Sequence, residues 1–314
     1  MKIALVGPGI LSIPPVGWGA VEILIWDYHE VLRKLGHDVS IVNKMGPKTL
    51  SYYQELVQEL NQTEYDFIHI HYDCFFQIVP YLTCKKVGMT SHYPYIDNPE
   101  KHTEDGFTPI FQFMVHYPGT FLMLAQKDTD FLVDCGANPE RFRLMENGIL
   151  IEKYQSTDTP EQGGKTIYLG KITLRKRQHV YCQLDNLDLI GPGGEGMRNW
   201  KGSWTREQVY CQLSHYGNLL LCSEGEADPL VVKEALVCGL GVVINRTSSK
   251  NLTNIQDCGF ITVIEDEQME DLLYLQKKID ENRAYAVVHR DEIRRYGSQF
   301  SMEHMVETYI KKII

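Results

Sequence analysis

No stretch of this 314-residue sequence stays apolar over the roughly 20 residues that a membrane-spanning helix needs. Apolar runs such as residues 3–6 and 219–222 have the length of strands. The first residues carry one Lys and a short apolar run before Gly7, which is too short for a secretory signal and is typical of a first strand. We therefore expect a cytoplasmic protein without a transmembrane segment, with peripheral binding to a membrane left open.

The sequence also lacks an excess of positive charge. It has 31 Lys and Arg against 41 Asp and Glu, which gives a formal net charge of −10. Because nucleic-acid binding requires a positive field over a wide surface, this balance argues against a nucleic-acid partner.

Paired cysteines are missing as well. The eight cysteines include no Cys-x-x-Cys pair, and most lie in apolar surroundings, as Cys222 does after three leucines. This pattern indicates free thiols in a reducing compartment rather than a disulfide framework or a zinc site.

Strand-like and helix-like segments alternate from the start of the chain. A helix is predicted over residues 21–35 and another over 127–135. Strands are predicted at residues 2–6, 38–43, 66–71 and 87–91. This order is typical of a parallel sheet, so we predict a first Rossmann-like domain over residues 1–157.

A second series of strands follows a polar segment at residues 157–164, which contains Pro160 and a Gly pair and is the predicted linker. The strands of this series are predicted at residues 166–169, 187–191, 218–222, 241–245 and 260–263. We predict a second Rossmann-like domain over residues 158–290. The remaining segment, 291–314, carries Met305, Tyr309 and Ile313 on one apolar helix face, which needs a surface to pack on.

The most informative segment surrounds Glu226 and Glu234. Asp228 followed by Pro229 predicts an N-cap and a first helical residue, directly after a strand. The free N–H groups and the positive dipole of such a helix start suit a diphosphate, and carboxylates accept hydrogen bonds from sugar and ribose hydroxyls. Two glutamates at this spacing are by themselves also compatible with solvated surface charges.

This segment resembles the E-x7-E signature of family 4 glycosyltransferases, which have the GT-B fold. The resemblance implies that Glu226 contacts the transferred sugar and that Glu234 contacts the ribose of the nucleotide. It also implies that the helix start binds the donor through Pro229, Leu230 and Val231. Where the family usually has Gly-Phe-Gly between the glutamates, this chain has Ala227, Asp228 and Pro229.

A second resemblance to the same family lies after the first strand of the second domain. Lys171 and Lys176 match the positions of two cations that hold the departing diphosphate in the family. Lys at the first position keeps the charge of the usual Arg but loses its bidentate geometry. An isolated basic cluster of this kind would instead be compatible with a solvated loop.

Two further positions match the family in the first half of the chain. The Gly-rich segment at residues 14–22 resembles the loop that opens the family's first helix, and Gly19 is the residue expected beside the donor phosphate. His92 follows a predicted strand, where the family often places a His that touches the donor sugar. His69 and His71 end another strand and are secondary candidates.

Two other motifs are interpreted as coincidental. The Gly-rich run at residues 191–196 suggests a dinucleotide site, but the second strand ends at Asn43 without the acidic residue that would hold an NAD ribose. Asp128 and Asp130 match the D-x-D motif of metal-dependent GT-A enzymes. They lie in a predicted helix, however, where residues two apart face different ways. We therefore expect no cofactor and no metal site.

The resemblance implies an α/β protein of the GT-B fold, with two Rossmann-like domains facing a central cleft and a C-terminal helix that crosses back to the N-terminal domain. It implies an acceptor side in the first domain and a donor side in the second. The expected activity is retaining, metal-independent transfer of a hexose from a nucleotide-diphosphate sugar, GDP-mannose ahead of UDP-glucose. The expected acceptor is a glycan, a glycoconjugate or a lipid-linked molecule. The residues expected to carry catalysis are Lys171, Lys176, Glu226 and His92.

Two alternatives stay open from the sequence. A non-hydrolysing sugar-nucleotide epimerase has the same architecture and binds the same class of ligand, and an inactive sugar-nucleotide-binding protein would keep the fold without turnover. The sequence also leaves a homodimer open.

Overall fold

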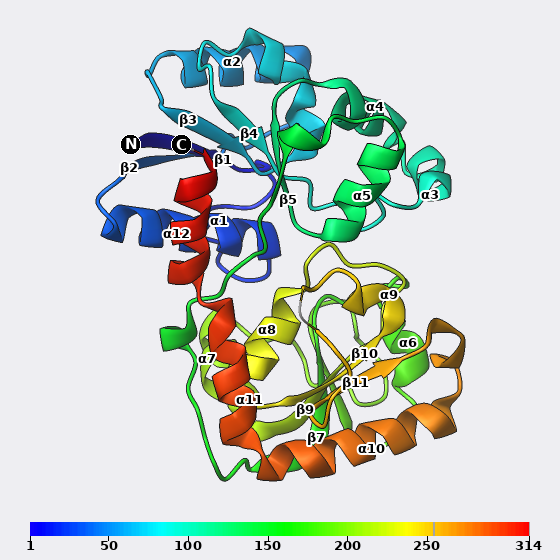
Figure 1. Cartoon of the computed structure of the whole chain (residues 1–314). Coiled ribbons are helices and arrows are strands. Elements are labelled where there is room, and N and C mark those ends of the chain that lie inside the picture. Colours follow the sequence, from blue (N-terminus) through cyan, green and yellow to red (C-terminus); the bar gives the residue numbers. More distant parts are fainter. Residues whose placement is uncertain (254, 314) are drawn as a thin grey trace. The chain divides into compact units, whose positions relative to one another are not determined.

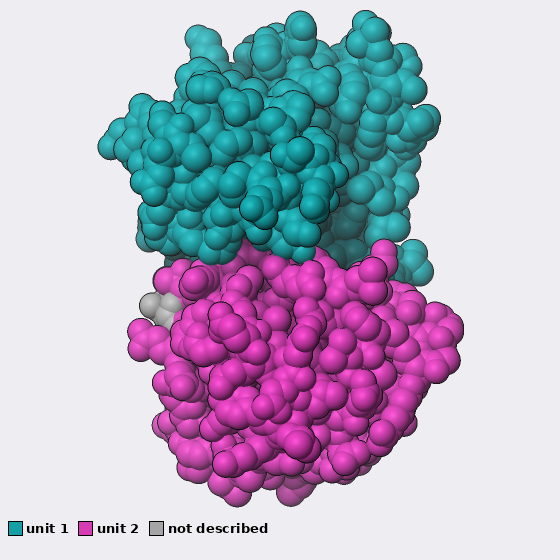
Figure 2. Space-filling view, turned by 90° about the vertical axis from the view of Figure 1, so that its right-hand side faces the viewer, with its two compact units in different colours: residues 1–147, 302–314 teal, residues 148–301 magenta. Residues whose placement is uncertain are grey.

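The computed structural model describes residues 1–253 and 255–313, and it divides into two compact units (Figure 1). Unit 1 comprises Met1–Asn147 and Met302–Ile314, and unit 2 comprises Gly148–Ser301 (Figure 2). Each unit contains its own parallel sheet. None of the helices in the described part of the chain combines the length and the apolar character that crossing a membrane requires.

The sheet of unit 1 has six parallel strands in the order β2-β1-β3-β4-β5-β6. Its strands are β1 (Lys2–Val6), β2 (Asp38–Val42), β3 (Phe67–Ile70), β4 (Val87–Met89), β5 (Thr120–Met123) and β6 (Phe142–Leu144). The strand β1 is almost continuously apolar and buried, because helices cover both faces of the sheet (Figure 1). The strand order reverses between β1 and β3, so the carboxyl ends of these strands flank the crevice where such sheets bind ligands.

The helices α1 and α2 of unit 1 each bury an apolar face. In α1 (Ala20–Lys34), the buried residues Leu24, Tyr28 and Val31 recur at helical spacing. In α2 (Leu50–Asn61), the Thr49 hydroxyl caps the first turn by accepting from the Tyr52 N–H at 3.3 Å. The other elements are η1 (Asp73–Tyr81), α3 (Pro99–Glu104), α4 (Thr108–His116), α5 (Gln126–Asp134) and η2 (Pro139–Arg141).

The C-terminal helix α12 (Met302–Ile313) belongs to unit 1 and packs on α1 (Figure 1). Its residue Tyr309 is fully buried, with its ring 5.3 Å from Tyr28 and 5.4 Å from His69 between centroids. The Lys312 ammonium donates to the Leu144 carbonyl. The predicted return of the C-terminal helix to the first domain is therefore confirmed, and the apolar face of α12 finds its partner there.

The sheet of unit 2 has five parallel strands in the order β11-β10-β9-β7-β8. Its strands are β7 (Gln162–Leu169), β8 (Leu187–Ile190), β9 (Tyr216–Leu221), β10 (Gly241–Asn245) and β11 (Ile261–Ile264). The helices are α6 (Gln178–Tyr181), α7 (Arg206–Gln212), α8 (Leu230–Val237), α9 (Arg246–Ser249), α10 (Leu272–Val288) and α11 (Arg290–Gly297). Short 3-10 segments complete it: η3 (Ile151–Lys153), η4 (Leu213–His215), η5 (Asp266–Gln268) and η6 (Ser298–Phe300). The predicted pair of Rossmann-like sheets is confirmed.

The chain passes from one unit to the other at residues 147/148 and 301/302. The sequence predicted domain boundaries at 157/158 and 290/291. Residues after 147 are tied to unit 2 by backbone hydrogen bonds. The Ile149 N–H donates to the Phe300 carbonyl and the Gln155 N–H donates to the Tyr210 carbonyl, both at 2.9 Å. The helix α11 packs on α8 of the same unit, so it does not belong with α12.

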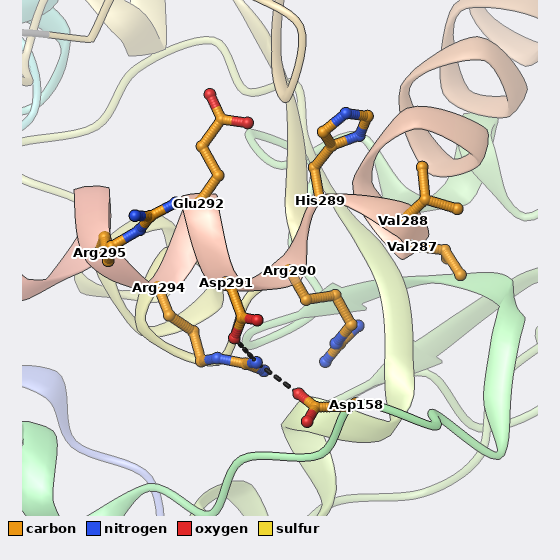
Figure 3. Close-up of a pocket in the computed structure, with 9 residues that line it drawn as sticks. All are labelled: Asp158, Val287, Val288, His289, Arg290, Asp291, Glu292, Arg294 and Arg295. Atoms are coloured by element: carbon orange, nitrogen blue, oxygen red, sulfur yellow. Dashed lines mark hydrogen bonds and ion pairs between the residues drawn. The ribbon is translucent and has the colours of Figure 1, made fainter.

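A buried arginine connects the start of α11 to the rest of unit 2 by hydrogen bonds. The Arg290 guanidinium donates to the carbonyls of Thr157, Ser214, Tyr216 and Cys238. An open cavity of about 320 Å³ lies beside it, lined by residues 287–292, 294, 295 and Asp158 (Figure 3). In this cavity the Arg294 guanidinium pairs with carboxylates of Asp158 and Asp291, so its charge is already compensated.

Candidate functional site

The loop after β7 brings Lys176 back over the end of that strand. Gly170 has φ of 156°, a conformation that side chains rarely adopt. A Cβ at this position would lie 3.4 Å from the Lys176 ammonium nitrogen, an ordinary van der Waals contact, so the requirement for glycine comes from the backbone conformation. A glycine is therefore required where the loop turns, and the Lys176 side chain passes beside it.

Lys176 and Glu226, predicted from separate motifs, form an ion pair. The Lys176 Nζ lies 3.2 Å from Glu226 Oε1, and the Arg175 Nη1 lies 3.3 Å from the same oxygen. The Glu226 residue is only 7% exposed. Arg175 also donates to the Gly225 carbonyl, and its own carbonyl accepts from the Glu224 N–H at 3.0 Å. Two cations thus converge on one carboxylate oxygen at the carboxyl edge of the sheet.

Lys171, the other predicted cation, lies in the same loop but is exposed to solvent. Within residues 1–253 and 255–313 no carboxylate forms an ion pair with it. The structure therefore brings Lys176 and Glu226 together and leaves the Lys171 ammonium available to a ligand. Arg175 was missed by the sequence analysis, although its position next to Lys176 was a visible signal.

The start of α8 differs from the prediction at Asp228. The helix begins at Leu230, its N-cap is Pro229, and no side chain caps it, so the predicted Asp228 N-cap is wrong. The Asp228 carboxylate instead pairs with the Lys233 ammonium at 2.8 and 2.9 Å, and both side chains are fully buried. A buried ammonium requires a counter-charge, and Asp228 supplies it. The ammonium therefore compensates the charge of this carboxylate, so that the carboxylate does not repel an anion bound at the helix start.

The residues expected at the donor-binding helix start occupy the first turn of α8. Pro229 is buried, whereas Leu230 and Val231 are half-buried. No side chain caps this helix, and the Val232 N–H of its first turn donates to the Pro229 carbonyl at 3.1 Å. The N–H groups of Leu230 and Val231 stay available for an anion.

Glu234 lies in the middle of α8 and is held by an arginine from another helix. Its Oε1 accepts from Arg206 Nη1 at 2.5 Å, and Arg206 Nη2 donates to the Tyr154 hydroxyl at 2.7 Å. Burial by itself would lower the pKa of Arg206, but the Glu234 carboxylate raises this pKa well above its ordinary value. Arg206 and Tyr154 were not found from the sequence.

In unit 1, Gly19 precedes α1 with φ of 156°. A Cβ there would lie 2.8 Å from Glu22 Oε2 and 2.9 Å from Leu11 Cδ1. Glu22 is buried, which raises the pKa of its carboxyl group, and the N–H groups of Leu11 and Glu22 itself donate to it. The need for glycine at position 19 is thus explained by packing. The predicted contact between Gly19 and a donor phosphate stays a prediction.

His92 follows β4 and belongs to a row of three imidazoles. Its ring centroid lies 5.9 Å from that of His71, which lies 3.7 Å from that of His69. Burial lowers the pKa of His92 to about 4 and that of His69 to about 3, and it lowers the pKa of His71 well below its ordinary value. His69 Nε2 bonds the Thr90 hydroxyl at 2.8 Å. Among the described residues, no hydrogen-bond partner contacts His92 Nε2 or either ring nitrogen of His71.

The D-x-D residues lie on α5 and have separate partners. Asp128 pairs with Lys127 at 2.9 Å, whereas Asp130 accepts from Gln126 at 2.7 Å. Burial raises the pKa of Asp128 to about 6. Across the described ranges, no group of three or more His, Cys, Asp and Glu side chains is arranged to hold a metal ion. All eight cysteines are free thiols.

The histidine row predicts a specific pH dependence of stability. The unfolded chain binds protons on histidine below about pH 6.5, but the folded chain keeps His71 neutral to much lower pH. His71 therefore contributes stability that is present above this pH and is lost on acidification, by up to about 1.4 kcal/mol per pH unit. His69 and His92, whose pKa values are lowered to about 3 and about 4, contribute in the same direction. We therefore expect His71→Phe to reduce the pH dependence of the free energy of unfolding between about pH 6.5 and 4.5 by the share of one histidine, as measured by urea unfolding.

The exposed His116 on α4 provides the matched control for this experiment. The His116→Gln variant should follow the pH profile of the unaltered chain. If the free energy of unfolding depends on pH in the same way for His71→Phe and for the unaltered chain, His71 is protonated in the folded protein. The interpretation of the histidine row is then wrong.

Comparison with known proteins establishes the fold. No protein-family model matches the chain, and no curated protein is similar to it in sequence. The structure is similar to that of HepE from Anabaena in complex with UDP and glucose, with a TM-score of 0.71 and 15% identity over 99% of each chain. It is also similar to sucrose-phosphate synthase from Thermosynechococcus elongatus, with a TM-score of 0.79 and 14% identity over 99% of this chain and 97% of that one. WaaG, a glycosyltransferase involved in lipopolysaccharide biosynthesis, gives a TM-score of 0.74 and 16% identity over 99% of each chain. The predicted GT-B fold is confirmed by these similarities, which span both units.

Proposed function

We propose that this protein is a glycosyltransferase that moves a hexose from a nucleotide-diphosphate sugar to a hydroxyl group of a glycan, a glycoconjugate or a lipid-linked acceptor. The observation that carries the proposal is the ion pair between Lys176 and Glu226 at the carboxyl edge of the unit 2 sheet. The free N–H groups of the α8 start and the carboxylate of Glu234 lie on the helix that follows. The similarity in fold to WaaG, a glycosyltransferase involved in lipopolysaccharide biosynthesis, supports the same reaction class.

Each of these groups has a part in the proposed reaction. Glu226 accepts hydrogen bonds from hydroxyls of the transferred sugar, and Glu234 accepts from the ribose. Lys171 and Lys176, together with the first-turn N–H groups of α8, bind the diphosphate and stabilise the charge that develops on it as it leaves. The proposed reaction retains the anomeric configuration. The departing diphosphate accepts the proton of the acceptor hydroxyl on the same face of the sugar, so catalysis consists of positioning and electrostatics.

UDP-glucose and GDP-mannose are the two donors that the proposal places first. GDP-mannose is supported by its frequency in the family that the sequence resembles. UDP-glucose is supported by the solved structure of HepE in complex with UDP-glucose, which has the same fold at 14% identity. Calorimetric titration with both donors and with UDP-galactose separates these possibilities.

We expect at least one of these donors to bind and to release its nucleoside diphosphate when an acceptor hydroxyl is supplied. Because no metal takes part in the proposed mechanism, turnover should persist in excess EDTA. Loss of turnover in EDTA that Mg²⁺ or Mn²⁺ restores would overturn the metal-independent mechanism. Failure of all three donors to bind would overturn the proposed function.

The two alternatives give different products in the same assay. An epimerase would convert the donor into another nucleotide sugar without any acceptor. This conversion does not change the mass of the donor, but it is visible by nuclear magnetic resonance. An inactive binding protein would bind the donor without releasing the nucleoside diphosphate. The contacts predicted for Gly19 and His92 are tested by titrating donor into Gly19→Ala and His92→Ala.

A further inference from the structure

The carboxylate of Glu234 is fixed in place by the guanidinium of Arg206. The 2.5 Å hydrogen bond between Arg206 Nη1 and Glu234 Oε1 joins two groups of opposite charge, which makes it stronger than a neutral one. The side chains of Glu234 and Arg206 are only 5% and 18% exposed. Solvent therefore screens this pair much less than a pair on the open surface.

Arg206 is itself held from two other directions. Its Nη2 donates to the Tyr154 hydroxyl at 2.7 Å, and its guanidinium carbon lies 4.7 Å from the centroid of the Tyr210 ring. Its backbone position is fixed as well, because Arg206 is the first residue of α7 and lies within the capping box that Thr205 and Gln208 form. The guanidinium thus has little freedom to follow a mobile carboxylate.

The arrangement leaves one oxygen of Glu234 available. Arg206 occupies Oε1, and among the residues that the structure describes no hydrogen-bond donor reaches Oε2. A glutamate side chain free on a helix samples several rotamers, and ordering it on binding costs free energy. The ion pair removes most of that cost before a ligand arrives, so Oε2 is a preorganised acceptor.

We propose that Arg206 is a positioning residue for the nucleoside of the donor: it holds Glu234 so that Oε2 accepts a hydrogen bond from a ribose hydroxyl. This inference rests on the proposed function, because it assigns the ribose of a nucleoside diphosphate to Glu234. A guanidinium donates hydrogen bonds and cannot accept them, so Arg206 does not itself bind the hydroxyl. Its effect passes through the carboxylate.

The test compares two ligands that differ only at the ribose. UDP and 2′,3′-dideoxy-UDP are titrated into the unaltered chain and into Arg206→Gln, and GDP and 2′,3′-dideoxy-GDP are titrated in the same way. In the unaltered chain, the diphosphate with ribose hydroxyls should bind about tenfold more tightly than its dideoxy analogue, the worth of one hydrogen bond to a charged group. In Arg206→Gln that preference should disappear, while the affinity for the dideoxy analogue stays the same.

A second pair of variants separates positioning from a merely structural role. Tyr154→Phe removes one anchor of Arg206 but keeps the ion pair, so it should reduce the ribose preference in part. Arg206→Lys keeps the charge without the fork geometry and should restore part of the preference that Arg206→Gln loses. Arg198→Gln, which removes an exposed arginine paired with Asp185, should leave both affinities unchanged.

The outcomes are distinguishable. If neither UDP nor GDP binds the unaltered chain, the proposed function fails and this inference fails with it. If a diphosphate binds and the ribose preference persists in Arg206→Gln, the proposed function stands and the role of Arg206 is overturned. A loss of equal size for the diphosphate and its dideoxy analogue would also overturn it, because a structural defect affects both ligands.

Discussion

Replacing Lys233 by methionine should destabilise unit 2 by about 3–5 kcal/mol, because it leaves the Asp228 carboxylate buried without its counter-charge. Both side chains are fully buried, and their charged atoms lie 2.8 Å apart. The Lys233 ammonium also lies 5.5 Å from the centroid of the Phe300 ring. Hydrogen exchange of the α8 and β9 amides, which reports the opening of this unit, is the measurement.

The double variant Asp228→Leu with Lys233→Met should recover most of the lost stability. Replacing a buried ion pair by apolar side chains of similar volume is often neutral or stabilising, whereas removing one partner is costly. Lys277→Met on α10 is the matched control, since Lys277 pairs with Glu281 on an exposed surface and should change the stability by less than about 0.5 kcal/mol. A single variant as stable as this control would show that the Asp228 charge is not buried in the folded protein.

The strands that could be predicted from the sequence are those bounded by clear turns. The prediction of residues 187–191 matches β8 closely, and residues 2–6 match β1. β5 and β6 were missed for different reasons. β5 lies in the apolar run of residues 121–125, which could belong to a buried helix as well as to a strand, and β6 has three residues.

The candidate site was predictable where its residues share a motif and not where they meet only in the fold. Lys176, Glu226 and Glu234 were found because their spacing resembles a family signature. Arg206 lies 28 residues before Glu234, and no local pattern links the two. Their contact depends on how α7 and α8 are placed in unit 2.

Asp228 shows a different limit of sequence reasoning. Its position before a proline is typical of an N-cap, and that preference was outweighed by Lys233. A lysine in a helix is normally expected to reach solvent, so nothing in the sequence indicated that its ammonium would be buried. The need to compensate a buried charge is larger than the free energy of one cap, which is about 1 kcal/mol.

Lys176→Ala should lower turnover of the donor by about 100- to 1,000-fold, the effect of removing one preorganised group that stabilises developing charge. Lys176 pairs with Glu226 at 3.2 Å, so its ammonium lies at the carboxylate that is proposed to bind the sugar. Its removal takes away both the partner of the departing diphosphate and one of the two cations that hold Glu226. Arg175, at 3.3 Å from the same oxygen, should keep Glu226 in place, so the fold should be unaffected.

The decisive measurement is kcat together with the donor Kd, because the proposed role requires both to change. We expect the donor affinity to fall by about tenfold, as for the loss of one charged hydrogen bond, and the remaining loss to appear in kcat. Lys176→Arg keeps the charge and should recover part of the activity. Lys165→Ala is the matched control, because Lys165 pairs with Asp188 on β8 of the same unit and has no part in the proposed site. Turnover in Lys176→Ala within about twofold of this control would remove Lys176 from the catalytic machinery, since a group that stabilises the leaving diphosphate cannot be lost without slowing its departure.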